Sequence, residues 1–391
     1  MNGAGDSDVL TLLPSNWYYN ASVIGFLKVL EHAGVSVENY LRDDGTVEID
    51  RSVFATENGD DRPKALEWYY HYHEVYVNPI LNKPLGLKIV GNSLYTNFIN
   101  PSSKTKDEHN LSLLVQYLSG DSFKTGVSEP CNLCCQSFSI IPDKDANQDF
   151  GDFLKNRSKL NMMHGSYIGG SFDFPNAFWN MKTSVKLCPL CIYLVLHHHL
   201  PFIRTTSGEL FINAPSFKIM WYINKIATEM MSRQPDMAGR EILGLSYLGL
   251  AQRIYSLLGT WSLMNIEMVI KKDGDISYFS LPLHISRVLN QKGIAALIHE
   301  AGEPLVFKMI LNGDFDDLIK LSHSLCKLLF AFNDISEGKP TDEMNNIISN
   351  DSYLKRLDKI TKKDITALRK LAIKLPLIYA RIRQVITQEY I

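Results

Sequence analysis

The chain has 391 residues, of which 45% are hydrophobic and 21% charged, so it is long enough to bury a sizeable core in two or three domains. Its 40 basic and 42 acidic residues exclude a strongly basic or acidic protein, and only the distribution of charge can indicate a nucleic-acid partner. The first residues carry no positive charge before an apolar run, so we expect no signal or transit peptide, no membrane attachment and a cytoplasmic location.

The first predicted element is a buried helix. Ser15 or Asn16 can cap it, apolar residues follow at three-to-four spacing, and Gly34 ends it. The Asp43-Asp44-Gly45 sequence then predicts a turn, which leads into a short strand over residues 47–49. The chain is therefore expected to open with a buried helix, followed by a turn and a short strand.

Three further elements are predicted before residue 290. A second helix is expected from Pro63 to Val77, and residues 100–110 have the composition of an exposed loop. From Met264 to Phe279 the apolar residues alternate, and Asp273-Gly274 supplies a turn. This last pattern predicts a β-hairpin.

The C-terminal part is predicted to be a helical bundle. After Asn290 the pattern is helical nearly to the end, with breaks at Pro304, Asn312-Gly313 and Gly338-Lys339-Pro340. The sequence thus predicts an α+β fold. A mixed N-terminal domain (residues 1–290) carries an inserted four-cysteine zinc subdomain (about 125–205) and is followed by a C-terminal helical bundle (291–391).

Five of the six cysteines fall in two clusters, each containing a C-x-x-C pair. Such a turn brings two thiolates close enough to share a cation, and two turns complete the tetrahedral four-sulfur shell that structural zinc prefers. We therefore expect a structural Zn²⁺ with no open coordination position for a catalytic water, bound by Cys131, Cys134, Cys188 and Cys191.

The cysteines have two other interpretations. A redox pair needs only one C-x-x-C motif, and a disulfide framework is disfavoured in the cytoplasm. Cys135 follows Cys134 directly and leaves open which sulfur of the first cluster binds. Cys326 lies in a helical apolar pattern, so we expect an inert buried cysteine there.

The sequence contains none of the common nucleotide-binding, zinc-protease or serine-hydrolase motifs, so we expect no catalytic site. His197-His198-His199 suggests a metal site at first sight. Three adjacent histidines cannot face one way on a helix or strand, so we interpret them as a helix end at the surface before Pro201.

Residues 151–180, between the cysteine pairs, combine basic residues, glycines, aromatics and asparagines. This composition suits phosphate contact by cations and base-edge contact by asparagines, although a solvated polar loop would look similar. The asparagines could instead bond their own backbone. The candidate residues are Lys155, Arg157, Lys159, Asn161, Asn176 and Asn180.

The C-terminal residues form a second basic region. From Asp351 to Ile391 ten lysines and arginines stand against four carboxylates. The last predicted helix has an apolar stripe, and cations recur on its opposite side, where they are expected to hold phosphates without reading sequence unless that side is merely solvated. These cations are Lys363, Lys370, Lys374 and Arg381.

The motifs stand in a distinctive order. A Ser15–Ala21 helix continues as Gly25–Leu30 and precedes the first C-x-x-C; the later segments are 176–180, 187–191, 211–213 and 265–267. This order resembles the CXXC-CXXC family of large subunits of type I CRISPR Cascade complexes, of the I-B or Cst kind. The resemblance spans roughly Leu10 to Leu289; the cysteine pairs are its specific part.

The resemblance implies a non-catalytic subunit of an RNA-guided surveillance complex. Such a subunit recognises the protospacer-adjacent motif in duplex DNA, helps to open the duplex, and recruits a helicase-nuclease or another effector. Its partners are the other Cascade subunits, the guide RNA, the target double-stranded DNA and the displaced strand, while guide pairing reads the sequence. The basic C-terminal bundle would line the displaced strand.

Two other classes of function stay open at this point. One is a zinc-stabilised nucleic-acid-processing enzyme whose site is assembled from dispersed residues, which activity of the lone protein on labelled DNA with magnesium would reveal. The other is a scaffold without nucleic-acid contact, which salt-dependent DNA binding by the assembled complex would eliminate.

Overall fold

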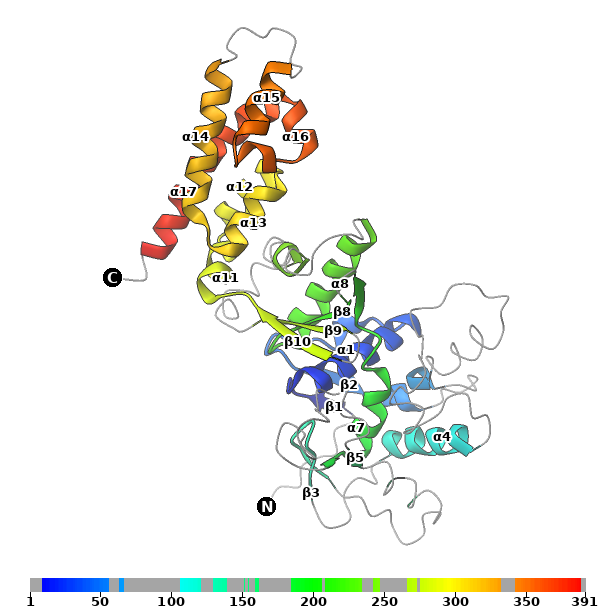
Figure 1. Ribbon diagram of the computed structural model, residues 1–391. Coiled ribbons are helices and arrows are strands. Elements are labelled where there is room, and N and C mark those ends of the chain that lie inside the picture. Colours follow the sequence, from blue (N-terminus) through cyan, green and yellow to red (C-terminus); the bar gives the residue numbers. More distant parts are fainter. Residues whose placement is uncertain are drawn as a thin grey trace, which may run out of the picture. The chain divides into compact units, whose positions relative to one another are not determined.

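The computed structural model describes residues 9–55, 63–66, 106–120, 129–138, 151, 154, 159–161, 184–205, 208–233, 242–246, 266–272, 275–331 and 342–387. Helices and small sheets make up two compact units (Figure 1). The first comprises residues 1–225 and 266–278, and the second comprises residues 226–265 and 279–391. None of the described helices combines the length and the apolarity that a bilayer crossing requires.

Helix α1 (Trp17–His32) opens the first unit, as predicted. The Asn16 side chain caps it by accepting a hydrogen bond from the backbone N–H of Tyr19, and the chain leaves it through Gly34, whose φ is +82°. Every residue from Tyr18 to Leu27 is buried. The helix is therefore surrounded by protein and is not an amphipathic surface helix.

A four-stranded sheet has the strand order β10-β9-β8-β7, and β8 is antiparallel to both of its neighbours. The predicted hairpin is confirmed as strands β9 and β10, while its turn residues 273–274 lie outside the described residues. Three consecutive residues of β8, from Leu210 to Ile212, are buried, so both faces of this strand are covered. The strands are β7 (Ile203–Thr205), β8 (Gly208–Asn213), β9 (Glu267–Lys272) and β10 (Asp275–Ser280).

Helix α8 (Phe217–Arg233) is tied to the central strand by one buried side chain. The Asn224 amide accepts the N–H of Ile212 at 2.9 Å and donates to the carbonyl of Ile212 at 2.7 Å. A side chain that satisfies both backbone groups of one residue acts like an added strand partner. It thereby fixes the helix beside the sheet.

Shorter elements complete the first unit. Strands β1 (Val9–Leu12) and β2 (Val47–Asp50) pair antiparallel, which confirms the strand predicted over residues 47–49. Of the helix predicted from Pro63, only the short turn η3 (Lys64–Leu66) lies within the described residues. The others are η1 (Val37–Asn39), η2 (Arg51–Phe54), α4 (Lys106–Ser119), β3 (Glu129–Pro130), β4 (Ser137–Phe138), β5 (Lys159–Asn161), β6 (Ser184–Lys186), α7 (Pro189–Leu194) and η7 (Val195–His197).

The loop predicted over residues 100–110 is wrong from Lys106 onward, because helix α4 begins there. The first turns of α4 are polar and resemble a loop in composition. Its later residues Leu111, Leu114, Val115 and Leu118 are buried at three-to-four spacing. The apolar half therefore fixes the helix, and the polar residues only form its N-terminal end.

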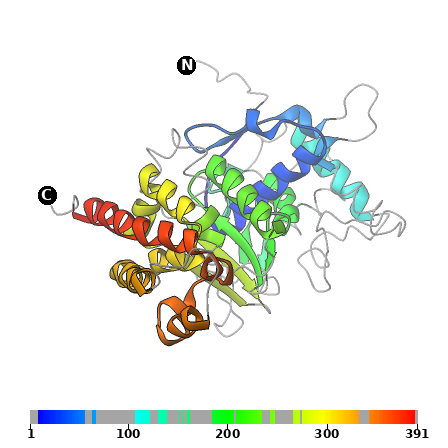
Figure 2. The same ribbon diagram turned by 90° about the horizontal axis from the view of Figure 1, so that it is seen from above.

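From Leu283 onward the described parts of the second unit are helical, in agreement with the helical pattern predicted after Asn290. The breaks at Pro304 and at Asn312-Gly313 are confirmed, and Gly302 and Gly313 end their helices with positive φ. Figures 1 and 2 both show α14 and α17 side by side. Cys326 of α14 is only half-buried. The helices are α11 (Leu283–Asn290), α12 (Lys292–Ala301), α13 (Pro304–Asn312), α14 (Phe315–Ala331), α15 (Asp342–Asn350), η8 (Leu354–Arg356), α16 (Lys359–Lys363) and α17 (Ile365–Thr387).

Helix α17 contains a proline at position 376. Proline has no N–H, so the carbonyl of Ala372, four residues earlier, has no helical donor. The hydroxyl of Ser322 on α14 donates to that carbonyl at 3.0 Å. A side chain of the neighbouring helix thus replaces the hydrogen bond that the proline removes.

The chain passes from one unit to the other after residues 225, 265 and 278, rather than at the predicted boundary between residues 290 and 291. Helix α11 belongs to the second unit because Ile285, Val288 and Leu289 are buried and the helix packs on α12 and α17. The short helix at residues 242–246 also belongs there, since Gly244 lies directly against Leu311 and Phe307. Residues far from the bundle in sequence therefore help to build it.

A close backbone approach joins α1 to η7 in the first unit. A Cβ atom built on Gly25 would lie 2.0 Å from the carbonyl oxygen of His197. No side chain fits in that space, so glycine is required here because it lets the backbones of α1 and η7 lie in contact, not because of its backbone freedom.

We expect Gly25→Ala to destabilise the protein by about 3 kcal/mol or more, because α1 and η7 must separate to admit the methyl group. Gly293→Ala in α12 is the matched control, since nothing lies within 4 Å of its added Cβ; it should leave stability unchanged or raise it by up to about 1 kcal/mol. Urea unfolding measures both. Equal unfolding midpoints for the two variants would contradict the close contact.

Candidate metal centre

The first cysteine pair lies in the tight turn between β3 and β4. The backbone N–H of Cys131 bonds to the carbonyl of Gln136, and the N–H of Cys135 bonds to the carbonyl of Cys131. Cys135 has a φ of +60° and is exposed. The turn thus presents Cys131 and Cys134 inward and Cys135 outward, which excludes Cys135 from the cluster.

The second cysteine pair joins β6 to α7. Cys188 precedes the first residue of α7, Pro189, and its sulfur accepts the N–H of Cys191 at 3.3 Å. The N–H of Cys188 in turn donates to the sulfur of Cys131 at 3.3 Å. The two pairs therefore share hydrogen bonds as well as position.

The four sulfurs gather at one point. Cys131, Cys134, Cys188 and Cys191 are all buried, and their Sγ atoms lie within 4.8 Å of one another. The Sγ atoms of Cys134 and Cys188 are 3.8 Å apart, well beyond a disulfide bond and equal to the edge of about 3.8 Å of a tetrahedron with metal–sulfur bonds of about 2.3 Å. The residues therefore fit a single four-coordinate metal ion.

The thiols of the cluster do not ionise independently. The pKa of Cys131 is held well below its usual range because the Cys134, Cys188 and Cys191 thiols donate hydrogen bonds to it. The pKa of Cys188 is raised because its thiol bonds to Cys131, and burial raises that of Cys191. Four thiolates buried together in this way require a cation to balance their charge.

A chain of polar contacts connects the first cysteine turn to the core. The hydroxyl of Ser15 donates to the carbonyl of Leu133, between the two cysteines, at 2.7 Å. Ser15 and the buried Asn20 exchange two hydrogen bonds, and the amide of Asn20 also donates to Asn213 at 2.8 Å. Asn213 on β8 donates to Glu267 on β9 at 2.8 Å. We call this chain, from Leu133 to Glu267, the amide relay.

The second contact of the cysteine turn is with its neighbouring strand. The backbone N–H of Asn132 donates to the carbonyl of Lys186, and the N–H of Lys186 donates to the side chain of Asn132. Tyr19 of α1 also lies near the four sulfurs; burial and then the cysteine charges raise the pKa of its phenol. It therefore stays neutral beside the cluster. The turn that carries Cys131 and Cys134 is therefore hydrogen-bonded both to the start of α1 and to β6.

The three histidines were expected at a helix end on the surface, and this expectation is wrong because two of them are buried. His197 and His198 are buried, and the ring of His197 lies 4.8 Å from that of Tyr193 and 5.4 Å from that of Phe26. The glycine at position 25 lets this segment approach α1 closely, which the sequence around the histidines does not reveal. Burial lowers the pKa of His197 and of His199 to about 3, so both rings are neutral.

The predicted nucleic-acid residues are distributed unevenly. Lys159 and Asn161 belong to β5, opposite Lys186 and Ser184 of β6, so part of the predicted loop is a strand. Lys155, Arg157, Asn176 and Asn180 lie outside the described residues.

The four C-terminal cations do not form one stripe on one helix. Asp364 caps α17, so Lys363 ends the preceding helix α16. Lys370 and Arg381 are exposed on α17, whereas the ammonium of Lys374 is bonded to the carboxylate of Glu300 on α12. Two of the four positions, Lys370 and Arg381, thus present exposed cations from α17 itself.

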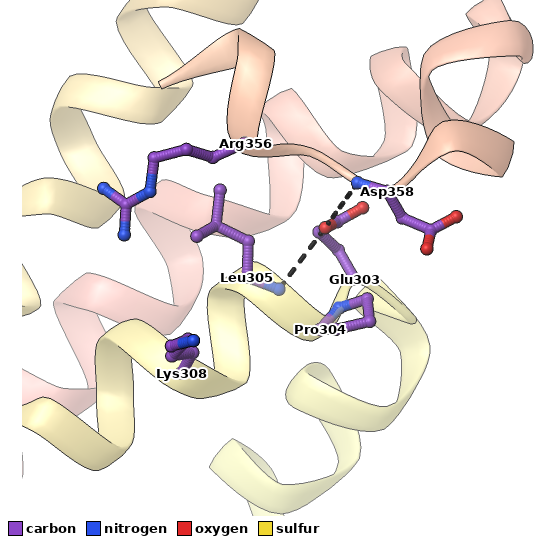
Figure 3. A pocket seen from close by; sticks show the side chains of 6 residues that line it. All are labelled: Glu303, Pro304, Leu305, Lys308, Arg356 and Asp358. Carbon is purple, nitrogen blue, oxygen red and sulfur yellow. Dashed lines mark hydrogen bonds between the residues drawn. The ribbon is translucent and has the colours of Figure 1, made fainter. Parts of the chain in front are cut away.

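A pocket of about 340 Å³ opens beside the start of α13 in the second unit (Figure 3). The buried Glu303 bonds through one oxygen to the N–H groups of Leu305 and Asp358, at 3.3 and 3.1 Å. Glu303 thereby caps α13 and fixes the segment before α16, so this pocket is a structural junction. Its lining residues are Glu303, Pro304, Leu305, Lys308, Arg356 and Asp358.

The four cysteines are the only cluster of metal-ligating groups found within the described parts of the chain. Four sulfurs fill a tetrahedral shell and leave no position for a substrate or a reactive water. The arrangement can therefore hold two chain segments together but cannot activate water. No protein-family model, curated protein or solved structure matches the chain at a significant level.

We expect the purified protein to contain about one tightly bound metal ion per chain, with zinc the ion that elemental analysis identifies. Cys188→Ser should lose the metal and unfold the segments around it, because metal binding at such sites contributes on the order of 10 kcal/mol and is coupled to folding. Cys135→Ser is the control, since Cys135 points away from the cluster. A wild-type protein without metal, or loss of metal in both variants, would contradict the site.

The buried histidines should make the protein less stable in acid. The pKa of His197 is about 3 in the folded chain and about 6.5 when unfolded, so the folded state excludes a proton that the unfolded state accepts. The contribution of neutral His197 to the free energy of unfolding is complete above about pH 6.5. It falls by up to about 1.4 kcal/mol per pH unit as the pH decreases toward about 3.

Urea unfolding at pH 7, 6 and 5 should therefore show a shallower pH dependence for His197→Phe than for the wild type. Both proteins keep the same cysteines, so acid release of metal affects them equally. Parallel pH profiles would show that His197 titrates normally in the folded protein.

Proposed function

We propose that this chain is a non-catalytic, DNA-contacting subunit of an RNA-guided antiviral complex, similar to the CXXC-CXXC large subunits of type I Cascade. In this role it recognises the protospacer-adjacent motif, helps to open the target duplex and recruits an effector. The ion in its four-cysteine site is a structural Zn²⁺.

The observation that carries the proposal is the amide relay. The motifs on which the resemblance rests are scattered from Ser15 to Glu267, yet four of them meet in one hydrogen-bonded chain. The early helix supplies Ser15 and Asn20, the first C-x-x-C supplies Leu133, and two strands supply Asn213 and Glu267. Their common location supports a single module rather than a chance order of short motifs.

A structural metal suits a subunit that binds DNA between its two cysteine pairs. The segment that contains the predicted contact residues begins after Cys134 and ends before Cys188. Its two ends are therefore fixed by the cluster, and the β5–β6 pairing ties residues 159–161 inside it to the strand that precedes Cys188. Fixing the ends of a binding segment reduces the conformational entropy lost when it orders on DNA.

The exposed cations of α17 support a contact with phosphates. Lys370 and Arg381 are exposed, and the structure shows no ion pair for either of them within its described part. Lys374 is already bonded to Glu300, so its contribution to DNA binding is expected to be smaller. In an RNA-guided complex such contacts hold the backbone while guide pairing reads the sequence.

We expect the Lys370→Ala, Arg381→Ala double variant to weaken target binding by the reconstituted complex equally for all sequences. The slope of log affinity against log salt should flatten by about two units, at roughly 0.9 per lost phosphate contact. The control removes the same charge through Lys218→Ala and Lys320→Ala, two cations that bond to Asp43 and Asp317 of the same chain. An unchanged slope in the first variant would assign its cations to solvent or a partner protein.

The wider proposal is tested by co-expressing the chain with the products of its neighbouring genes and a guide RNA. The assembled complex should bind matched DNA more tightly when the adjacent motif is present, and the chain alone should not cut labelled DNA with magnesium. Failure to assemble with a guide RNA, or cleavage of DNA by the lone chain, would contradict it.

A further inference from the structure

A second feature of the first unit is a half-buried lysine whose ammonium group lies beside two aromatic rings. The Nζ atom of Lys271 on β9 lies 4.2 Å from the ring centre of Phe202 and 5.8 Å from that of Trp17. Tyr278 on β10 contacts Trp17 with ring centres 6.5 Å apart and is 54% exposed. We call these four residues the Lys271 cluster; α1, β9 and β10 are labelled in Figure 1.

The ammonium group of this cluster has no ion-pair partner within the part of the chain that the structure describes. The carboxylate that acts on it is Glu209, which faces it across β8 and β9 and lies 3.9 Å from Arg204. Burial lowers the pKa of Lys271 to about 8, and Glu209 only partly opposes this effect. The rings stabilise the cation by cation–π attraction, but an anion beside it would stabilise it further.

The cluster therefore offers two different kinds of contact side by side. Lys271 suits an anion, and the partly exposed rings of Trp17 and Tyr278 suit a flat apolar face. A nucleotide carries both groups, a phosphate and a base, in one unit. In a duplex the base faces are covered by their neighbours, so only an unpaired base can stack on a protein ring.

We infer that the Lys271 cluster binds one unpaired nucleotide of single-stranded DNA, with the base stacked on the exposed Tyr278 ring and the phosphate held by Lys271. The inference rests on the proposed function and adds to it a binding site for the opened strand. The site lies apart in sequence from the residues between the cysteine pairs and from the C-terminal cations. It reads no base edge, so it is expected to tolerate every base.

The test uses the full-length chain and two labelled oligomers of equal length, an oligothymidylate and a strand of abasic residues, which keeps the phosphates and lacks the bases. Tyr278→Ala should weaken oligothymidylate binding about tenfold and leave binding of the abasic strand unchanged, because stacking is lost. Tyr278→Phe keeps the ring and should bind like the wild type. Lys271→Met should weaken binding of both oligomers, because it removes the phosphate contact.

Two control variants match these changes. Lys272→Met removes the neighbouring lysine of β9, which successive alternation places on the other face of the strand. Phe330→Ala removes an aromatic ring that is 75% exposed on α14. Neither should reproduce the loss seen with Tyr278→Ala, and thermal melting of every variant verifies that it is folded.

The outcomes separate this site from the wider function. If Tyr278→Ala binds oligothymidylate like the wild type, or loses affinity equally for the abasic strand, the stacking site is wrong even though the complex still binds DNA. If both cluster variants keep DNA binding but fail to join the reconstituted complex, the cluster contacts a protein and the inference is overturned. If neither the wild-type chain nor the complex binds DNA, the proposed function itself fails.

Discussion

The first unit depends on the contact between the turn that carries Cys131 and Cys134 and the N-terminus of a buried helix. The carbonyl of Leu133, midway between two cysteines, accepts the Ser15 hydroxyl at the start of α1. That same helix end is bonded through Asn20 and Asn213 to the central strands. A buried amide left without a partner costs about 1–3 kcal/mol, so displacement of the turn would be felt at each bond of the relay. A metal ion bound by the four cysteines would therefore stabilise the sheet through this relay, without contacting it.

Several buried polar side chains of this unit bond to specific backbone partners. Asn224 bonds to both backbone groups of Ile212, and the ring nitrogens Nδ1 of His197 and His198 face backbone carbonyls three residues earlier. These groups can be buried only in one arrangement of the surrounding chain. A core built in this way is specific rather than merely apolar, so it holds segments that are distant in sequence in one geometry.

The sequence predicted those features that depend on local spacing. The cap at Asn16, the C-x-x-C pairs and the alternation of the β9–β10 hairpin each lie within a few residues, and each agrees with the structure. Features that depend on distant partners were not predictable. The burial of His197 requires a glycine 172 residues earlier, and the role of Asn20 requires Asn213, which is 193 residues away. Spacing alone also could not exclude Cys135, which the backbone turns outward.

The proline in α17 constrains the order in which residues 322 and 376 could have changed during evolution. Ser322 supplies the hydrogen bond that Pro376 removes, so the two residues are energetically linked across two helices. A chain that acquired the proline first would have carried an unsatisfied carbonyl, whereas the buried hydroxyl of a serine acquired first could bond to a carbonyl of its own helix. The less costly order is therefore the one in which Ser322 is acquired before Pro376. In relatives of this chain the proline should occur only where position 322 carries a hydroxyl.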